Sequence, residues 1–252
     1  MSSACYILMA RGLTLIQRIY ADHLLSYLRE ISNLAQNSIP MNALVRAIIL
    51  LLFPLSPLPL FSQSVPDTAI LGTVAPDTFQ AVFVTTKGEF TIEAYRSWSP
   101  AGVDRLYQLI RSGFYNNNCL FRVQPEYVVQ FGISNNPDAN KFWDKHPVPD
   151  EPVVGHNLKG VISYARDGKE TRTAQLFINK KDNFKLDTID YNGLRGFPPI
   201  ARVISGFDVI EQFNAQYLFE PANHQDSVMV QGNAYWERKF PGLDYIIEVK
   251  FK

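Results

Sequence analysis

Two strand-like segments carry the polar and aromatic side chains best placed to do chemistry. In the segment CLFRVQ, the alternation of a strand puts Arg122 and Gln124 on one face. In the segment QLFIN, the same alternation puts Gln175 and Phe177 on one face. The Arg122 guanidinium is permanently charged and presents a planar fork of donors. Arg122 therefore offers a fixed hydrogen-bond donor, although on its own it is more typical of a surface arginine on a strand.

Nucleophilic and metal-dependent chemistry has little support in the sequence. Ser163 lies outside any G-x-S-x-G pattern, so it is not expected to act as a nucleophile. Cys119 is expected to be a buried strand thiol. His146, His156 and His224 stand apart from one another, and the two cysteines of the chain are not spaced for zinc. We therefore expect no hydrolase, no metal site and no cofactor.

The composition describes a globular protein without an obvious polyanionic partner. The chain has 252 residues, of which 46% are hydrophobic, and this is ample material for a core. Lys plus Arg number 24 and Asp plus Glu number 24, so the formal net charge is zero. A balanced charge gives no reason to expect nucleic acid or an anionic membrane as partner. Function must therefore be read from local motifs.

The N-terminal quarter of the chain reads as a targeting region. Residues 47–61 (AIILLLFPLSPLPLF) form an uncharged apolar run that follows Arg46 and precedes small residues ending at Ser64. This pattern predicts a secretory signal peptide over 41–64, starting at Met41, and a periplasmic or secreted domain. The run is short for a bilayer and is broken by prolines, so no membrane span is expected after processing. The alternative is an uncleaved membrane anchor formed by 47–61.

Two further N-terminal segments have no assigned chemistry. Residues 1–40 are an extension whose apolar residues recur at helix-like intervals. Our hypothesis is that translation begins at Met41, and that this extension is not part of the natural protein. Residues 65–77 contain two prolines and a glycine with few charges, and this predicts a linker to the domain at 78–252.

The rest of the chain alternates short strands with turn residues, which is typical of a barrel or sandwich. Ser99, Pro100 and Gly113 predict the start and end of one helix, and a second short helix is expected at 206–213. We predict a mainly β fold, a closed antiparallel eight-stranded β-barrel capped by two helices, with long surface loops at 135–158 and 214–242. The strand candidates are 79–86, 90–95, 119–124, 127–132, 160–165, 175–179, 200–204 and 244–251.

Two segments resemble the signature segments of one known family, in order and at the family's spacing. They are residues 119–132 (CLFRVQPEYVVQFG) and 160–179 (GVISYARDGKETRTAQLFIN). The flanking segments GFYNNNCLFRV and ISGFDVIEQF are also similar. Over about 79–251 the chain resembles the cyclophilins, which are peptidyl-prolyl cis/trans isomerases, of a bacterial-like, secreted kind. The resemblance implies an enzyme that speeds rotation of X–Pro bonds in folding polypeptides outside the cytoplasm. It implies proline-containing polypeptides as partners, and we expect a monomer.

The resemblance also implies roles for individual residues. Arg122 matches the family's catalytic arginine, and Gln130 matches the glutamine that hydrogen-bonds the substrate backbone. Phe177 matches the aromatic floor of the proline pocket, and it completes the expected catalytic set. The expected substrate-binding residues are Tyr127, Val128, Ala165, Arg166, Gln175, Leu186 and Phe197.

The chemistry of prolyl isomerisation independently calls for such a set. Rotation about an X–Pro bond twists an amide against a barrier of ~20 kcal/mol, and the uncatalysed step takes tens of seconds or longer. No covalent step is needed, because the catalyst has only to favour the twisted amide over both planar forms. Twisting frees the lone pair of the prolyl nitrogen to accept a hydrogen bond. A fixed donor such as Arg122 beside an apolar proline pocket meets this need.

Several positions depart from the family pattern. Glu126 replaces the usual glycine after Pro125, and residues 131–134 (FGIS) replace a Gly-Gly-x-Asp-like ending. Lys185 stands where a Trp or Phe is common, and an insertion at about 187–196 precedes Phe197. These departures motivate an alternative function, a cyclophilin-like module or chaperone that binds proline peptides with little turnover.

Overall fold

The computed structural model describes residues 65–252, and these belong to one compact unit. The extension 1–40 and the signal peptide predicted at 41–64 lie outside the described residues. Within 65–252 no helix is both long enough and apolar enough to cross a membrane.

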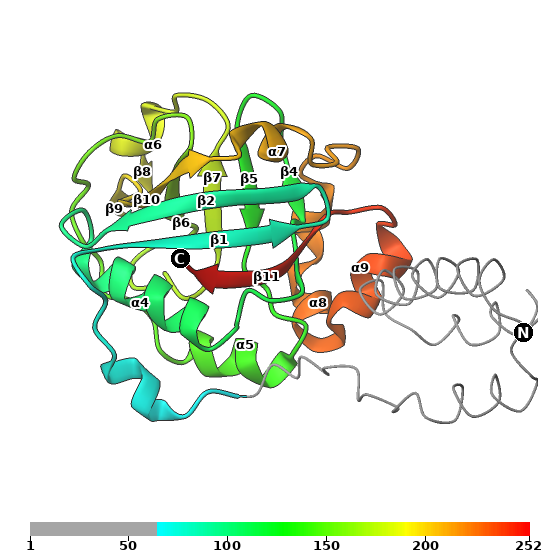
Figure 1. Ribbon diagram of the computed structural model, residues 1–252, viewed down its shortest axis with the longest axis horizontal. Coiled ribbons are helices and arrows are strands. Elements are labelled where there is room, and N and C mark those ends of the chain that lie inside the picture. The colour runs from blue at the N-terminus through cyan, green and yellow to red at the C-terminus, as the bar shows by residue number, and fades with distance from the viewer. Residues whose placement is uncertain (1–64) are drawn as a thin grey trace, which may run out of the picture. The chain divides into compact units, whose positions relative to one another are not determined.

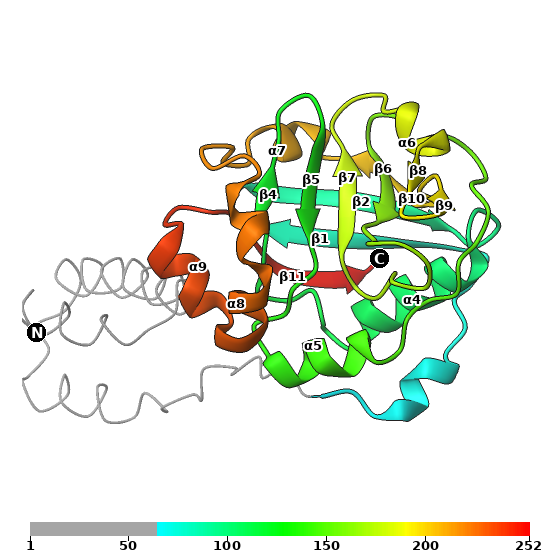
Figure 2. The ribbon, with the colours of Figure 1, turned by 180° about the vertical axis from the view of Figure 1, so that it is seen from behind.

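Nine strands form one antiparallel sheet, in the order β3-β11-β1-β2-β10-β6-β7-β5-β4 (Figures 1 and 2). A separate two-stranded hairpin, β8–β9, lies within the insertion at 187–196. The mainly β architecture predicted from the sequence is confirmed. The strands of the large sheet are β1 (Thr78–Thr85), β2 (Gly88–Tyr95), β3 (Asn118–Cys119), β4 (Arg122–Val123), β5 (Val128–Phe131), β6 (Val161–Tyr164), β7 (Leu176–Asn179), β10 (Pro199–Ser205) and β11 (Tyr245–Phe251), and those of the hairpin are β8 (Asp190–Tyr191) and β9 (Leu194–Arg195).

The sheet is curled, but its two edge strands, β3 and β4, are not paired with each other. The closed eight-stranded barrel predicted from the sequence is therefore not what the structure shows. The single strand predicted at 119–124 is divided in two. Its first part, β3, pairs with β11, and its second part, β4, pairs with β5. Between them the chain crosses from one edge of the sheet to the other over Leu120 and Phe121, and no ladder among residues 65–252 pairs β3 with β4. One segment thus supplies both edges, and this raises the strand number to nine.

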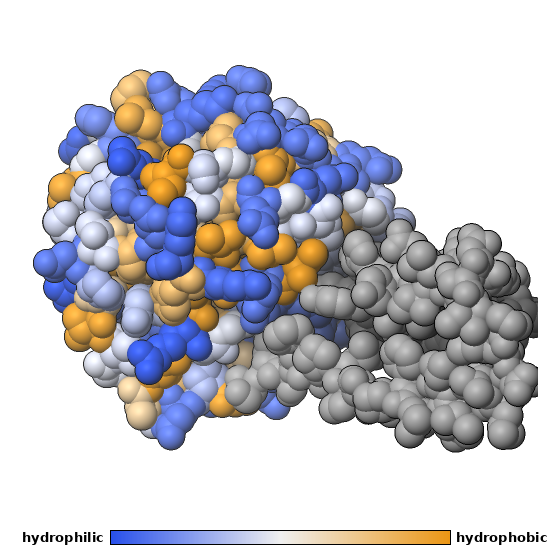
Figure 3. Space-filling model, in the orientation of Figure 1, coloured by the Kyte–Doolittle hydropathy of each residue, from blue (hydrophilic) through white to orange (hydrophobic). Residues whose placement is uncertain are grey.

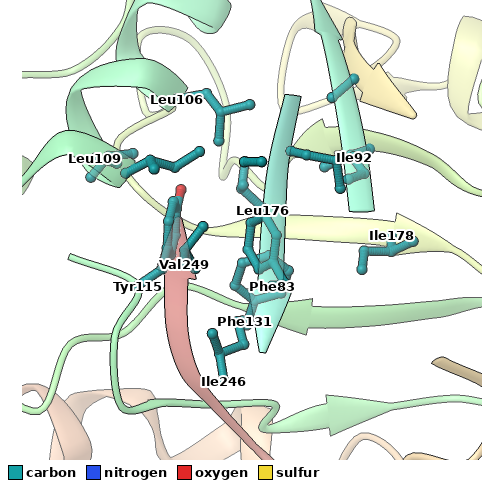
Figure 4. Close-up of a cluster of buried hydrophobic side chains, with 14 of the residues drawn as sticks. Phe83, Ile92, Leu106, Leu109, Tyr115, Phe131, Leu176, Ile178, Ile246 and Val249 are labelled. Atoms are coloured by element: carbon teal, nitrogen blue, oxygen red, sulfur yellow. The ribbon is translucent and has the colours of Figure 1, made fainter. Parts of the chain in front are cut away.

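The concave side of the sheet is filled by a continuous apolar core. Phe83 and Phe90 stack with ring centroids 4.8 Å apart, and Phe131 contacts Phe83 edge to face at 6.0 Å. Figure 4 shows Phe83 and Phe131 in one cluster with Leu106 and Leu109, which a helix contributes. The interior is therefore packed with side chains and leaves the outer surface of the sheet for ligands.

The two predicted capping helices are present, α4 (Pro100–Arg111) below the sheet and α7 (Phe207–Glu211) above it in Figure 1. Ser99 is the N-cap residue of α4 as predicted, but its side chain does not accept the helix N–H groups. The Glu151 carboxylate accepts from the N–H groups of Ala101 and Gly102 at 2.8 and 3.1 Å. Glu151 is in turn held by the buried Arg172 at 3.0 Å. A residue distant in sequence therefore replaces the local cap.

Further short helices occupy segments that the sequence predicts as loops. Residues 135–158 contain α5 (Pro137–Asp144), and 214–242 contain the 3₁₀ helix η2 (Glu220–His224) followed by α8 (Gln225–Gln231) and α9 (Asn233–Lys239). A single helical turn, α6 (Lys185–Thr188), precedes the β8–β9 hairpin. The prediction of only two helices was wrong. The additional helices are short and are stabilised by burial of single aromatic residues, such as Trp143 and Trp236, which leave no periodic apolar pattern in the sequence.

The segment predicted as a linker, 65–77, is attached to the domain. It begins with the 3₁₀ helix η1 (Thr68–Gly72), and the Gln108 side chain of α4 donates to the carbonyl oxygens of Leu71 and Thr73 at 3.1 and 2.9 Å. The face that carries β1, β2 and β11 mixes hydrophilic and hydrophobic residues (Figure 3), as expected where one side of each strand faces solvent.

Candidate active site

Arg122, Gln130 and Phe177 lie in one row across three neighbouring strands. Arg122 of β4 is directly opposite Gln130 of β5, and Gln130 is directly opposite Phe177 of β7. Residues directly opposite one another in an antiparallel pair point to the same face. Their neighbours Val123 and Val129 belong to the core, so the row faces outward. Figure 2 shows β4, β5 and β7 side by side on this face.

The guanidinium of Arg122 is held by two glutamines. Its Nε donates to Oε1 of Gln124 at 2.7 Å, and its Nη1 donates to Oε1 of Gln130 at 3.1 Å. The Tyr127 ring lies with its centroid 5.4 Å from the guanidinium carbon. Burial lowers the pKa of Arg122 from its ordinary value, but an arginine keeps its charge at any physiological pH. The site thus presents a fixed, partly desolvated cationic donor.

A small apolar cluster lies beside this donor and is separate from the main core. Val128, Phe177, Leu186 and Phe197 are all buried, and Tyr127 is packed against them. Phe177 and Phe197 meet edge to face with centroids 5.7 Å apart. The residues come from β5, β7 and α6 and from the segment before β10. Together they form an apolar pocket wall suited to a small aliphatic ring.

Arg166 supports this pocket through its side chain. Its Nη1 donates to the carbonyl oxygen of Tyr191 at 3.2 Å, and its Nη2 donates to that of Leu194 at 2.9 Å and to that of Gly196. Its guanidinium carbon also lies 4.6 Å from the centroid of the Phe197 ring. Arg166 therefore fixes the β8–β9 insertion and, with it, one wall of the pocket.

These features border one groove of about 710 Å³ on the outer face of the sheet. All ten site residues predicted from the sequence line it, including Ala165 and Gln175. Other lining residues were not predicted, because they lie in the insertion, in the predicted loop 214–242, or at polar positions of the second signature segment. They are Asp167, Thr171, Thr173, Ile189, Tyr191, Phe219, Ala222, Asn223, Gln225 and Asp226.

The turn that connects the donor strand to the pocket strand is strained. The N–H of Tyr127 donates to the carbonyl oxygen of Gln124 at 3.2 Å, so Pro125 and Glu126 are its central residues. Glu126 has a φ of 58°, in the left-handed region, where a type II turn calls for glycine. The departure at Glu126 is therefore accommodated with the turn intact, at a cost in conformational energy.

The departure at 131–134 also leaves the strand in place. Gly132 has a φ of 114°, and a Cβ on it would lie 2.5 Å from the Cα of Gln175. The N–H of Gly132 donates to the side chain of Asn118 at 2.8 Å. A side chain at position 132 would therefore clash with the backbone at Gln175. Glycine at this position lets the end of β5 pack closely against the segment that carries Gln175.

The arrangement can bind an extended peptide, place an aliphatic ring in the apolar pocket and direct a charged donor at an adjacent backbone atom. It offers no nucleophile beside a general base, and no three His, Cys, Asp or Glu residues converge as a metal site within the described part of the chain. The fold and the groove thus define a protein that recognises polypeptide segments through electrostatics and apolar contact.

The comparisons with known proteins agree with this class. The family model described as "Cyclophilin type peptidyl-prolyl cis-trans isomerase/CLD" matches residues 81–232. Peptidyl-prolyl cis-trans isomerase A of Dickeya dadantii is 32% identical over 152 residues, covering 58% of this chain and 77% of the relative. Peptidyl-prolyl cis-trans isomerase-like 1 of Aspergillus fumigatus is 31% identical over 100 residues, covering 38% of this chain and 62% of the relative.

A solved structure is similar in fold. The cyclophilin type peptidyl-prolyl cis-trans isomerase of Cryptosporidium parvum has a TM-score of 0.51 and 16% identity, covering 69% of this chain and 98% of that one. A second structure of that protein, in the presence of the dipeptide Ala-Pro, has a TM-score of 0.50. The chain belongs to the cyclophilin-type peptidyl-prolyl cis-trans isomerase family, and the isomerase function predicted from its sequence is confirmed.

Proposed function

We propose that the groove binds proline-containing segments of polypeptides and that Arg122 accelerates rotation of the X–Pro bond. The proline ring occupies the apolar cluster formed by Val128, Phe177, Leu186 and Phe197. The guanidinium of Arg122 donates to the prolyl nitrogen as the amide twists. This hydrogen bond is made in the twisted state and is weak in both planar states, so it lowers the barrier selectively.

The remaining residues of the row orient the peptide. Gln130 accepts from Arg122, and its amide group faces the groove, where it can exchange a partner for the substrate backbone. Ala165 lines the groove next to the end of β6. Tyr127 covers the guanidinium and closes the pocket on one side. No covalent intermediate and no cofactor enter this mechanism.

The observation that carries the proposal is the direct pairing of Arg122, Gln130 and Phe177 across β4, β5 and β7. It puts the charged donor and the aromatic floor of the pocket on one face, two strands apart, which is a span of about 10 Å. The Cryptosporidium parvum relative has been solved in the presence of Ala-Pro, which supports an X–Pro dipeptide as the minimal ligand of such a groove.

A protease-coupled isomerisation assay on an Ala-Pro-containing peptide tests the proposal. The wild-type protein is expected to accelerate the cis-to-trans step, and Arg122→Ala is expected to lower kcat/KM by about 10²–10³, because one fixed donor to the transition state is lost. Circular dichroism and thermal unfolding of Arg122→Ala control for folding.

The same assay separates an isomerase from a binding module. A module would bind the peptide, as measured by fluorescence anisotropy, and leave the isomerisation rate unchanged. Full isomerase activity of Arg122→Ala would show that the Arg122 guanidinium takes no part in catalysis.

We further propose that residues 41–64 are a signal peptide and that the domain acts in the periplasm or outside the cell as a monomer. The uncharged run at 47–61, the preceding Arg46 and the small residues up to Ser64 support this. N-terminal sequencing of the protein from its natural source should find a start at Val65. A mature protein that retains 47–61 in the membrane fraction would favour the anchor instead.

A further inference from the structure

We propose that Phe219 and Gln225, from the helical segment at 214–242, position the guanidinium of Arg122 for isomerisation. This inference rests on the proposed role of Arg122. The segment was expected to be a surface loop, and the structure instead makes it a wall of the groove. The segment contributes five residues to the lining of the groove: Phe219, Ala222, Asn223, Gln225 and Asp226.

Phe219 contacts the guanidinium directly. Its ring centroid lies 4.7 Å from the guanidinium carbon of Arg122, which is closer than the Tyr127 ring at 5.4 Å. Two aromatic rings therefore contact one cation, and each adds an attraction that is stronger where water is excluded. Phe219 is 44% exposed, so its position is justified by this contact more than by burial in the core.

Gln225 lies at the end of a chain of hydrogen bonds that starts at Arg122. Nη1 of Arg122 donates to Gln130 at 3.1 Å, Nε2 of Gln130 donates to Gln175 at 2.9 Å, and Nε2 of Gln175 donates to Gln225 at 2.8 Å. Nε2 of Gln225 finally donates to the carbonyl oxygen of Ala222 at 3.0 Å. Every donor points the same way, away from the guanidinium. Gln225 thus fixes the amide orientation of Gln175 and, through it, the orientation of Gln130 that lets Oε1 face Arg122.

The segment that carries these two residues is tied to the site from behind. Trp236 of α9 is fully buried and stacks on Phe121, the neighbour of Arg122, with centroids 5.7 Å apart and planes 10° apart. Asn233 donates from its side chain to the carbonyl oxygen of Asn117 at 2.8 Å. The 3₁₀ helix η2, which precedes α8, packs against β4. The helical segment at 214–242 therefore holds strand β4 through Phe121 and the guanidinium of Arg122 through Phe219.

The kinetic test uses Phe219→Ala and Gln225→Leu in the full chain. Phe219 and Gln225 are not part of the apolar cluster that holds the proline ring, so KM for an Ala-Pro peptide should change less than about twofold. Because the guanidinium loses a contact that orients it, kcat should fall about three- to tenfold. Gln225→Glu keeps the acceptor for Gln175 and should recover most of kcat. Val230→Ala and Gln231→Ala are matched controls, because both residues lie in α8 outside the groove and should leave kcat unchanged.

A spectroscopic readout separates positioning from general destabilisation. The Nε–Hε signal of Arg122 in ¹H–¹⁵N spectra, assigned by its absence in Arg122→Lys, should be sharp in the wild type and broadened in Phe219→Ala and Gln225→Leu. The two control variants should leave it sharp.

Two results would overturn the proposal. One is an unchanged Arg122 signal with unchanged kcat in both variants. The other is an effect on KM alone, which would make Phe219 a substrate-contact residue. If the wild type itself shows no isomerase activity, the proposed function fails, but the Arg122 signal still decides whether Phe219 and Gln225 position the guanidinium.

Discussion

Arg122 sits where a polar network meets an apolar pocket, and this boundary decides what the guanidinium can do. Gln124 and Gln130 fix its two donating edges, and burial lowers its pKa without removing the charge. A partly buried charge attracts a hydrogen-bond partner more strongly than a charge in bulk water does, because the local dielectric constant is lower. The same side chain on an exposed strand would contribute little.

Phe177 offers a test of the pocket at the level of one residue. Phe177→Leu keeps an apolar side chain, so the cost in stability should stay below about 1.5 kcal/mol. The floor of the pocket is lowered, and its edge-to-face contact with Phe197 is lost. KM for an Ala-Pro peptide should therefore rise several-fold, with a smaller change in kcat. Steady-state kinetics on the folded variant measure both, and an unchanged KM would mean that the proline ring binds elsewhere.

The turn from β4 to β5 connects the donor with the pocket, and its residues carry the clearest local strain. Glu126 adopts a positive φ, and the attraction of its carboxylate to Lys180 is the side-chain interaction that opposes this strain. Glu126→Gly should raise the free energy of unfolding by about 0.5–1 kcal/mol, since relief of the left-handed strain outweighs the added flexibility of the unfolded chain. Urea denaturation measures the change.

Glu126→Ala is the matched control, because it removes the carboxylate and keeps the strain. Equal stabilisation by alanine and glycine would assign the effect to charge and contradict the conformational account.

Strands β1, β2 and β10 are joined on the outer face by Glu93. It is directly opposite both Gln80 and Arg202. Hydrogen bonds from Tyr95 and Gln80, followed by one from Arg202, hold the pKa of Glu93 below its usual value. A carboxyl group whose folded pKa is lowered stabilises the fold above its unfolded pKa, and this stabilisation is lost as the pH falls through the folded value.

Glu93→Gln should therefore be less stable than the wild type at pH 7. The difference should shrink as the pH falls below about 4.3, the ordinary value for Glu. Thermal unfolding of both proteins at several pH values measures this difference. A gap that stays constant from pH 7 to pH 3 would show that the ionised carboxylate is not the stabilising group.

For the whole molecule, the sequence was sufficient where the structure is local and periodic. Strand alternation and turn residues predicted the strands of the sheet. The family resemblance predicted ten residues that share one groove, eight of them in the two signature segments. The sequence alone did not reveal that residues 119–124 divide between two edges of the sheet, because the crossing at Leu120 and Phe121 depends on the pairing partners β11 and β5.

The helical segment at 214–242 was missed for a related reason. Its helices are too short to show a periodic apolar face, and they are held by a few tertiary contacts. A signal was present in Trp236 and Phe240, which are four residues apart and both buried. In α5, Asn136 followed by Pro137 is a recognisable helix start, and its side chain accepts from the N–H of Asp138 at 2.9 Å.

Exchange spectroscopy by NMR on an Ala-Pro-containing peptide, with catalytic amounts of the full protein, measures cis/trans interconversion without a coupling protease. The wild type should produce exchange cross-peaks within a second, whereas the uncatalysed step takes tens of seconds. Arg122→Lys keeps the charge but loses the planar fork held by Gln124 and Gln130, and it should lose most of the exchange while still binding the peptide. Undiminished exchange with Arg122→Lys would contradict the claim that an oriented guanidinium beside the proline pocket performs the catalysis.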